Sequence, residues 1–548
     1  MQNENRGPGL WKYNSALNND ATFVSKMEEH IDKIKTDMVN NQDKQFVWEF
    51  MKFEMRTCAM EYSKKLAKEK RQSKLLLENK LIHFEKLNID ISQNEEYIQT
   101  KIALEKIFEE RIEGQRIRSK CSIYEMGEKS SKYFLNLEKK NAKLSSITTL
   151  QNGNGDLMTE KGEVENEILT FYKNLFKSKC KATAENCRQY LDNLNMKRLS
   201  ETEAALCEKS LTLDELSESL DEMQLDKSPG NDGLTTEFYK QFWDGVKSPY
   251  YDSLIQAKLY GELSTSQRQA IIRLIEKKDK DKTKICNWRP ISLLNIDLKI
   301  VSRALAKRLK TVLPSIINSN QTAYVLNRFI GEGSRVISDI LEITETLSLE
   351  GYIATIDFEK AFDSLHHTFL TETLRIAGFQ DYFINWIKVF LNKQESCVIN
   401  DGTTTPYFSL ERGARQGDPI SAYLFIIALE ALFMSVKKNA NIRPIKIIDI
   451  EFLYTAYADD ATFFLENEIS LSYLIEELKM FSKYSGLMPN YSKCEFAGIG
   501  VKRGALRALC NFKTVDLTLY SIKILEIHFS YNITLRDERN FLITVKNI

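Results

Sequence analysis

The 548-residue sequence predicts a protein of the α+β class, in which a helical N-terminal arm precedes a larger part that mixes helices with strands. Two observations lead to this prediction. No proline occurs between Pro8 and Pro229, and residues 41–144 are mostly strong helix formers with apolar side chains at three- and four-residue steps. Farther along, short apolar runs such as 351–358 and 453–464 have the length and composition of strands.

Composition describes an ordinary globular chain rather than a disordered or collagen-like one, since 43% of the residues are hydrophobic, 28% are charged and nine are prolines. At roughly 150 residues per domain, the length predicts two to four domains. Lys and Arg together equal Asp and Glu at 76 each, so any attraction to nucleic acid must come from local patches.

No membrane span is expected, because the longest strongly apolar run, residues 422–434, contains Glu430 and is shorter than the roughly 20 residues that cross a bilayer. The first residues have neither a secretory nor a transit pattern, which predicts an intracellular location in the nucleus or the cytoplasm. Nine cysteines without a C-x-x-C pair predict reduced thiols and no zinc site.

The helical arm, residues 1–145, contains six basic residues between 64 and 74 against Glu69 alone. Such a face either contacts a phosphate backbone or is simply solvated. A boundary is expected at residue 145, followed by a hairpin whose turn is the Asn-Gly-Asn-Gly stretch at 152–155. Residues 201–226 predict acidic helices, which end in a loop at 227–233 rich in Pro and Gly.

The next part of the chain is basic. Residues 268–289 hold eight basic and three acidic residues, and residues 298–331 contain no carboxylate. The cations of this second segment are Lys299, Arg303, Lys307, Arg308, Lys310 and Arg328. They predict a surface for a polyphosphate or a nucleic-acid backbone, with a solvated helix face as the alternative.

Three carboxylates are candidates for metal chemistry. Asp357 follows the strand predicted at 351–358, and Asp459 and Asp460 stand between two short apolar runs about a hundred residues later. Acids that converge at strand ends suit Mg²⁺, which prefers a few carboxylates together with substrate phosphates. A Gly-rich loop at 413–419 precedes an apolar helix predicted at 421–436, an arrangement that lets backbone approach a nucleotide.

Residues 357–363, 415–419 (RQGDP) and 457–460 (YADD) occur in the order and spacing of motifs A, B and C of reverse transcriptases. The stretches KSPGNDG at 227–233, NWRPISLLN at 287–295 and GLMPNYSKC at 486–494 resemble in particular the enzymes of non-LTR (LINE-type) retrotransposons. The resemblance covers about residues 200–532, and it is looser for the helical arm and for residues 6–12.

The resemblance implies that Asp357 and Asp459 bind two catalytic Mg²⁺ ions, for which Mn²⁺ is expected to substitute, and that Asp460 completes the acidic cluster. It also implies that the Phe358 carbonyl contacts the metal bound to the nucleotide. The ring of Phe362 would exclude a ribose 2′-hydroxyl and so select deoxynucleotides, with a plain core aromatic as the alternative.

Further side chains are implied to contact the nucleotide. Cations from the fingers would grip the triphosphate, two residues of the Gly-rich loop would lie against the incoming nucleotide, and a lysine would protonate pyrophosphate. In that order these residues are Arg289 with Lys277 or Lys278, then Gln416 and Gly417, then Lys493. The implied partners are an RNA template, a DNA primer and deoxynucleoside triphosphates; the oligomeric state stays open.

The implied fold is a right-hand polymerase with fingers and a palm built on an antiparallel sheet, preceded by the helical arm. The expected divisions are the arm at 1–145, a linker and N-terminal fingers extension at 146–255, fingers and palm at 256–531, and the start of a thumb at 532–548. Two departures stand out: Glu526 occupies a position where the family usually has Gly, and the sequence stops where thumb helices would begin.

These features predict an RNA-directed DNA polymerase of a non-LTR retrotransposon. From its two ends we expect a fragment without the endonuclease domain and most of the thumb, and hence weak extension by this chain alone. Two alternatives stay open. One is an inactive nucleic-acid-binding relic, although the three intact acids speak against it. The other is an intron-encoded maturase-type reverse transcriptase, which shares the palm.

Overall fold

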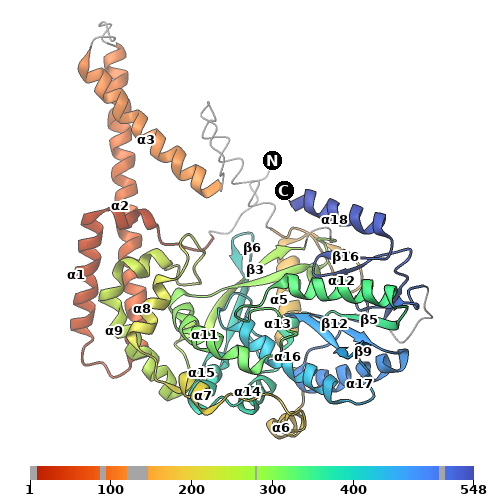
Figure 1. The fold of residues 1–548 in the computed structure, drawn as a ribbon. Helices are drawn as coiled ribbons and strands as arrows, with labels where there is room; N and C mark the ends of the chain where they lie inside the picture. Colours follow the sequence, from red (N-terminus) through yellow and green to blue (C-terminus); the bar gives the residue numbers. More distant parts are fainter. Residues whose placement is uncertain (1–8, 87–93, 120–145, 278–279, 505–511, 548) are drawn as a thin grey trace.

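The computed structural model describes residues 9–86, 94–119, 146–277, 280–504 and 512–547 (Figure 1). The helices are η1 (Ser15–Asn19), α1 (Ala21–Asp37), α2 (Lys44–Lys86), α3 (Glu95–Ser119), α5 (Lys161–Phe176), α6 (Ala184–Asp192), α7 (Glu201–Glu208), α8 (Leu213–Asp221), α9 (Thr236–Tyr260), α10 (Thr265–Arg268), η3 (Ile285–Asn287), α11 (Ile296–Ile316), α12 (Ile330–Thr346), α13 (Ala361–Ser364), α14 (His367–Ile376), α15 (Asp381–Leu391), α16 (Ser421–Lys438), α17 (Glu468–Ser485) and α18 (Ile533–Asn547).

The strands are β1 (Leu150–Gln151), β2 (Leu157–Met158), β3 (Gln269–Glu276), β4 (Trp288–Leu293), β5 (Glu350–Ile356), β6 (Glu395–Asn400), β7 (Thr403–Thr404), β8 (Phe408–Ser409), β9 (Ile445–Ile447), β10 (Ile450–Phe452), β11 (Tyr454–Tyr457), β12 (Asp460–Leu465), β13 (Glu495–Gly500), β14 (Lys513–Val515), β15 (Ile522–Ile524) and β16 (Ile527–Phe529). The predicted α+β class is confirmed, as are the hairpin near 152–155 and the helix at 421–436.

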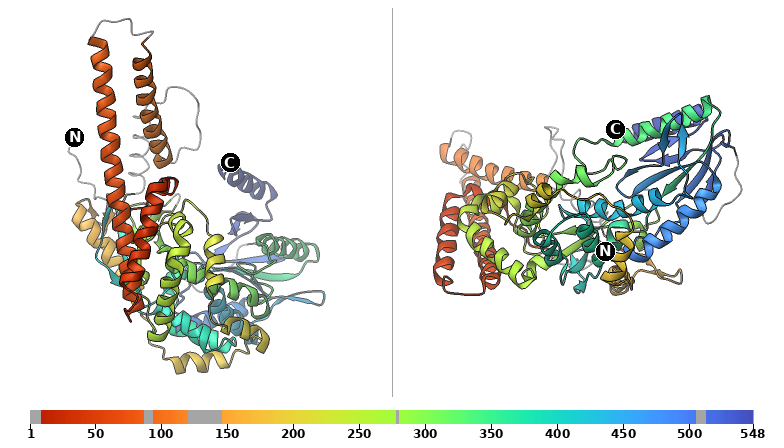
Figure 2. Two further views of the ribbon diagram at one scale, coloured as in Figure 1. Left: turned by 90° about the vertical axis from the view of Figure 1, so that its left-hand side faces the viewer. Right: turned by 60° about the horizontal axis from the view of Figure 1, so that its bottom comes forward.

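The helical arm divides into a packed base and a projecting part. Trp48, Met51 and Met55 in the first half of α2 are fully buried and belong to the same core as α9. The second half of α2 projects from the body, and α3 runs alongside it (Figures 1 and 2). Lys70 on α2 pairs with Glu110 on α3 at 2.8 Å. This ion pair joins the two projecting helices. It also neutralises one of the six basic residues between 64 and 74.

The predicted phosphate surface at 298–331 is wrong for three of its six cations, because the acidic segment 201–226 folds onto them. Arg308 on α11 pairs with Glu215 on α8 at 2.7 Å, and Lys307 pairs with Glu222 at 2.8 Å. Arg303 also reaches Glu222. Arg328 instead donates to backbone carbonyls, Lys299 lies half-buried, and Lys310 is exposed. The positive charge of α11 is therefore largely neutralised within the molecule.

One five-stranded sheet, in the order β11-β12-β5-β13-β14, forms the centre of the molecule; its neighbouring strands are antiparallel except for the parallel pair β13 and β14. Side chains alternate between its two faces, as they must in a strand. Tyr352, Ala354 and Ile356 pack with the helical core that contains α14, α16 and α17. Ile353 packs on the opposite face, in a second core with α12 and the β15–β16 hairpin.

A second sheet contains β4, β3, β6 and β7, with β8 paired to β6. β3 and β4 are antiparallel, so that Arg289 lies opposite Ile275, close to the end of the ladder where residues 277–287 connect the two strands. The seven cysteines within the described ranges are free thiols, as predicted. None of the described helices is long and apolar enough to cross a bilayer.

Candidate active site

Asp357 is the first residue after β5, on the sheet face that carries Ile353 and Thr355. The residues that follow are held by the 486–494 segment. The Asp357 carbonyl accepts a hydrogen bond from the Asn490 N–H at 2.7 Å, and Phe358 forms an antiparallel bridge with Pro489. Phe358 itself is buried. The backbone around the first candidate acid is therefore fixed by this segment.

Asp459 lies in the two-residue turn between β11 and β12, and Asp460 begins β12, paired with Tyr457. The other turn residue, Ala458, has φ +53°, a left-handed conformation that costs a residue with a side chain about 1 kcal/mol or more. A turn of this kind lifts Asp459 out of the strand ladder. This confirms the two short strands predicted around 457–460.

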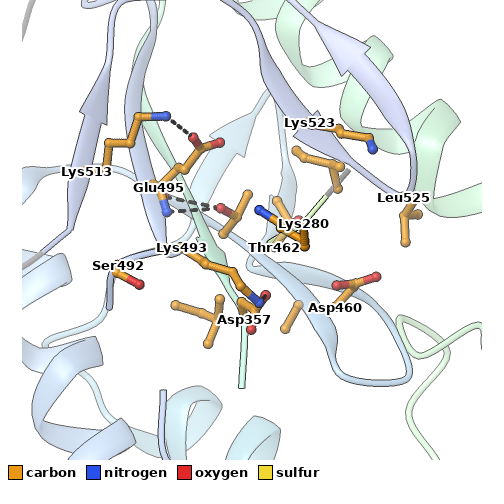
Figure 3. A pocket seen from close by; sticks show the side chains of 14 residues that line it. Lys280, Asp357, Asp460, Thr462, Ser492, Lys493, Glu495, Lys513, Lys523 and Leu525 are labelled. Atoms are coloured by element: carbon orange, nitrogen blue, oxygen red, sulfur yellow. Dashed lines mark hydrogen bonds and ion pairs between the residues drawn. The ribbon is translucent and has the colours of Figure 1, made fainter. Parts of the chain in front are cut away.

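Strand pairing places the three acids in one region, because β12 lies between β11 and β5. Asp357 and Asp460 line one cavity, in which their side chains point toward the same region (Figure 3). Burial, followed by the neighbouring Asp357 carboxylate, raises the pKa of Asp459. Burial also raises the pKa of Asp460 to about 6, with smaller contributions from Asp459 and Asp357. Concentrated negative charge of this kind is what a bound cation would neutralise.

Lys493 occupies the position beside Asp357, with its Nζ 2.8 Å from Asp357 Oδ2. Within the described part of the chain, no three His, Cys, Asp or Glu side chains converge as a ready metal-ligand set. The donors are nevertheless the carboxylate oxygens that Mg²⁺ prefers, and the pKa values of Asp459 and Asp460 are raised chiefly by burial and then by neighbouring carboxylates. The residues fit a divalent cation, provided that Lys493 leaves Asp357.

Cations from β4 and from the segment between β3 and β4 lie near these acids. Burial lowers the pKa of Lys277, and repulsion from Lys493 and Arg289 lowers it further, so that these three cations share one field. Arg289 is exposed on β4, whereas Lys278 lies outside the described residues. Lys360, which the sequence did not single out, donates to the carbonyls of Cys286 and Trp288 at 3.2 and 3.3 Å. It joins the loop after β5 to the strand that carries Arg289.

The Gly-rich loop lies against both β4 and α13. The Gln416 carbonyl accepts from the Ser292 N–H at 2.8 Å, and the Gln416 side chain donates to the Asp363 carboxylate at 3.3 Å. Gly417 has φ +117°, and a Cβ there would stand 2.6 Å from the Ser292 carbonyl oxygen. This contact requires glycine, because any side chain would collide with backbone.

The ring of Phe362, in the short helix α13, stacks on Phe425 of α16 with 4.4 Å between the ring centroids. The residue is half-buried rather than enclosed. Its backbone carbonyl accepts from the Ala414 N–H at 2.7 Å, which fixes it next to the Gly-rich loop. Phe362 and Gln416 therefore lie close together, joined by contacts between α13 and the Gly-rich loop.

A cavity of about 470 Å³ separates the central sheet from the β15–β16 hairpin. Asp357, Asp460 and Lys493 lie at one edge of it, and Lys513 and Lys523 lie across from them (Figure 3). Lys513 pairs with Glu495 at 2.6 Å. The sequence did not identify these two lysines, because they come from short strands whose proximity to Asp357 depends on the tertiary fold.

The β15–β16 turn contains the departure noted at Glu526. Both turn residues, Leu525 and Glu526, have positive φ, at +51° and +65°. The Glu526 side chain is exposed and pairs with Lys523 at 2.6 Å, and its carboxylate contributes to the raised pKa of Asp460. The glycine that the similar family usually has at this position adopts a positive φ without strain. Glu526 has the same backbone conformation although it carries a side chain.

Burial raises the pKa of Asp363 to about 7, above its usual 3.8. The folded state therefore holds a proton that the unfolded state has lost between about pH 4 and 7, and the stability contributed by this group falls as the pH rises through that window. Asp363→Asn removes the effect. We expect the unfolding free energy of the variant, relative to that of the parent, to be higher at pH 8 than at pH 5 by on the order of 2 kcal/mol.

Denaturant unfolding of both proteins at the two pH values measures this difference. Asp381→Asn, at an exposed carboxylate paired with Arg375, is the matched control and should show no such gain. An equal difference between Asp363→Asn and the parent at pH 5 and pH 8 would show that Asp363 does not titrate in this range.

Comparison with known proteins adds evidence that is independent of this geometry. Residues 275–525 match the family model "Reverse transcriptase (RNA-dependent DNA polymerase)". The chain is 29% identical over 501 residues to the "Transposon TX1 uncharacterized 149 kDa protein" of Xenopus laevis, which covers 91% of this chain and 38% of that protein.

Two Drosophila melanogaster proteins are also similar. The "Retrovirus-related Pol polyprotein from type-2 retrotransposable element R2DM" is 27% identical over 279 residues, covering 50% of this chain and 25% of that protein. The "RNA-directed DNA polymerase from mobile element jockey" is 26% identical over 322 residues, covering 56% of this chain and 33% of that protein. The chain thus spans well under half the length of each of these three relatives.

Proposed function

We propose that this chain, which is a reverse transcriptase of the non-LTR retrotransposon type, extends a DNA primer on an RNA template. The observation that carries the proposal is the pairing of β12 with β5, which places Asp460 and Asp357 at one cavity with Asp459 in the adjoining turn, near the cations Lys277 and Arg289. Acids next to an electropositive surface suit a reaction in which a triphosphate is bound and its α-phosphate is attacked.

The proposed fold is a right-hand polymerase. The sheet β11-β12-β5-β13-β14, with α14, α16 and α17 behind it, would be the palm, and the sheet that carries Arg289 would belong to the fingers. The proposed divisions are an arm at 1–145, a fingers extension at 146–255, fingers and palm at 256–531, and the first thumb residues at 532–548. The cavity between the palm sheet and the β15–β16 hairpin would then adjoin the primer end.

We propose Mg²⁺ as the cofactor, held by Asp357 and Asp459 with Asp460 beside them. Two such ions, when bound, acidify the primer 3′-hydroxyl and neutralise charge on the phosphates. Arg289 and Lys277 would neutralise the triphosphate, which relieves their mutual repulsion.

The surface around the Gly-rich loop would orient the nucleotide. Gln416 and Gly417 would lie against it, Phe358 would present its carbonyl, and the Phe362 ring would face the sugar. Lys493, released from Asp357, would donate a proton to pyrophosphate; its ion pair at 2.8 Å shows that it reaches the acids.

The test is primer extension on an RNA template, with deoxynucleotides or ribonucleotides and with Mg²⁺ or Mn²⁺. We expect template-directed products that require deoxynucleotides and a divalent cation. Binding of the RNA–DNA hybrid, measured in parallel by fluorescence anisotropy, separates the alternatives. Hybrid binding without extension under either metal would support an inactive nucleic-acid-binding relic instead.

A further inference from the structure

Gln321, in the loop between α11 and α12, makes direct contact with the turn that carries Asp459. Its side chain is fully buried. The Gln321 Nε2 donates to the Ala458 carbonyl at 3.2 Å, and its Oε1 accepts from the Ala458 N–H at 2.9 Å. The same Oε1 accepts from the Ala323 N–H at 3.1 Å. One amide side chain therefore satisfies both backbone groups of the residue that precedes Asp459.

The turn depends on such a partner. Ala458 is buried and has φ +53°, a conformation that a non-glycine residue keeps only when its surroundings hold it there. Without Gln321 the Ala458 N–H and carbonyl would be buried without these partners, which favours a different backbone conformation. Because Asp459 is the next residue, a change in the Ala458 dihedrals would redirect its carboxylate.

The loop that carries Gln321 is itself firmly held. It extends the central sheet beyond β11, since the Ala456 N–H donates to the Asn320 carbonyl at 2.8 Å and the Ala456 carbonyl accepts from the Thr322 N–H at 2.9 Å. Arg328 donates to the Gln321 carbonyl at 2.7 Å. The buried Glu430 of α16 accepts from the Asn318 N–H at 3.2 Å. Gln321 therefore acts from a rigid support rather than from a free loop.

We propose that Gln321 is a positioning residue that fixes the conformation of Ala458 and thereby the direction of the Asp459 carboxylate. This inference rests on the proposed function, because it takes Asp459 as a catalytic acid. Misplacement of a catalytic group by about 1 Å costs roughly 10²-fold in rate. Loss of the Gln321 hydrogen bonds should therefore lower the rate of nucleotide addition more than loss of two buried hydrogen bonds in a remote part of the core.

Gln321→Met tests the proposal, because Met has a similar length but neither donates nor accepts comparably. Gln256→Met is the matched control. Gln256 is also a buried glutamine that bridges backbone, accepting from the Gln45 N–H at 2.7 Å and donating to the Gln42 carbonyl at 3.1 Å. It lies where the base of the arm meets α9, away from the candidate acids. Any effect of Gln256→Met on the rate therefore comes from lost stability alone.

Two readouts are combined. The first is hydrogen exchange at the Ala458 amide, which requires no catalysis. The second is the single-turnover rate of nucleotide addition as a function of Mg²⁺ concentration, together with hybrid affinity. For Gln321→Met we expect faster exchange at Ala458, a rate lowered by about 10- to 100-fold, a higher half-saturating Mg²⁺ concentration and unchanged hybrid affinity. Gln256→Met should leave all four unchanged.

Gln321→Glu serves as a second variant if Gln321→Met fails to fold. It keeps an oxygen that accepts from the Ala458 N–H, so exchange there should stay slow and the rate should lie between those of the parent and Gln321→Met. Unchanged exchange at Ala458 in Gln321→Met, or an equal rate loss in Gln256→Met, would overturn the positioning role. An inactive parent with faster Ala458 exchange in the variant would instead refute the proposed function alone.

Discussion

Asp459→Asn is expected to lower metal-dependent nucleotide addition by about 10³-fold or more while hybrid binding stays close to that of the parent. The amide keeps the shape of the side chain but removes the charge that would bind a cation. A 10³-fold loss corresponds to about 4 kcal/mol of transition-state stabilisation. Binding persists because the acids repel phosphates, and contact with the nucleic-acid backbone comes from other residues.

Stability separates this effect from misfolding. Burial and the Asp357 carboxylate raise the pKa of Asp459, so its charge is unfavourable in the fold, and the neutral Asn should be at least as stable at pH 8. Single-turnover kinetics and denaturant unfolding measure the two quantities. Asp449→Asn, at an exposed residue between β9 and β10, is the control. Addition at the parental rate by Asp459→Asn would refute the site.

Phe362→Val is expected to reduce the preference for deoxynucleotides over ribonucleotides by about 10- to 100-fold, the range over which shape discrimination in a pocket usually operates. The ring stacks on Phe425 and remains half-exposed beside the Gly-rich loop, where the resemblance places the nucleotide sugar. A valine leaves space for a 2′-hydroxyl. The lost packing should cost on the order of 1–3 kcal/mol of unfolding free energy.

The ratio of kcat/KM for a matched deoxynucleotide and ribonucleotide measures this preference. Phe362→Tyr keeps the ring and should keep the preference, so it separates steric exclusion from general disturbance of the loop. If Phe362→Val left the ratio unchanged, Phe362 would be a packing residue for Phe425 and would have no role in substrate choice.

The parts of the site predicted correctly from sequence are those that local pattern determines. A short apolar run followed by Asp357, and two runs around Asp459 and Asp460, predicted strands and a turn at the observed places. Sheet pairing then brings the acids together, because β12 lies directly beside β5. The Gly-rich loop also followed from local sequence, and the tight approach of Gly417 to Ser292 explains its glycine.

Contacts between distant segments were not predictable in the same way. The phosphate surface at 298–331 was predicted from the number of cations, without the acidic side chains that pair with them. Arg308 pairs with Glu215, which is 93 residues away in the sequence. Gln321 carries no charge and belongs to no periodic pattern, and its contact with Ala458 spans 137 residues. Lys493 was expected near pyrophosphate, whereas here it pairs with Asp357, an arrangement that depends on how the 486–494 segment packs against β5.

The most direct test of the proposed active site is an experimental structure of the chain with an RNA–DNA hybrid, an incoming deoxynucleotide and a divalent cation. We predict that the α-phosphate lies beside Asp357 and Asp459, that Arg289 and Lys277 contact the triphosphate, and that Lys493 has left Asp357. A nucleotide bound elsewhere, with the Lys493–Asp357 ion pair intact, would contradict the proposed site.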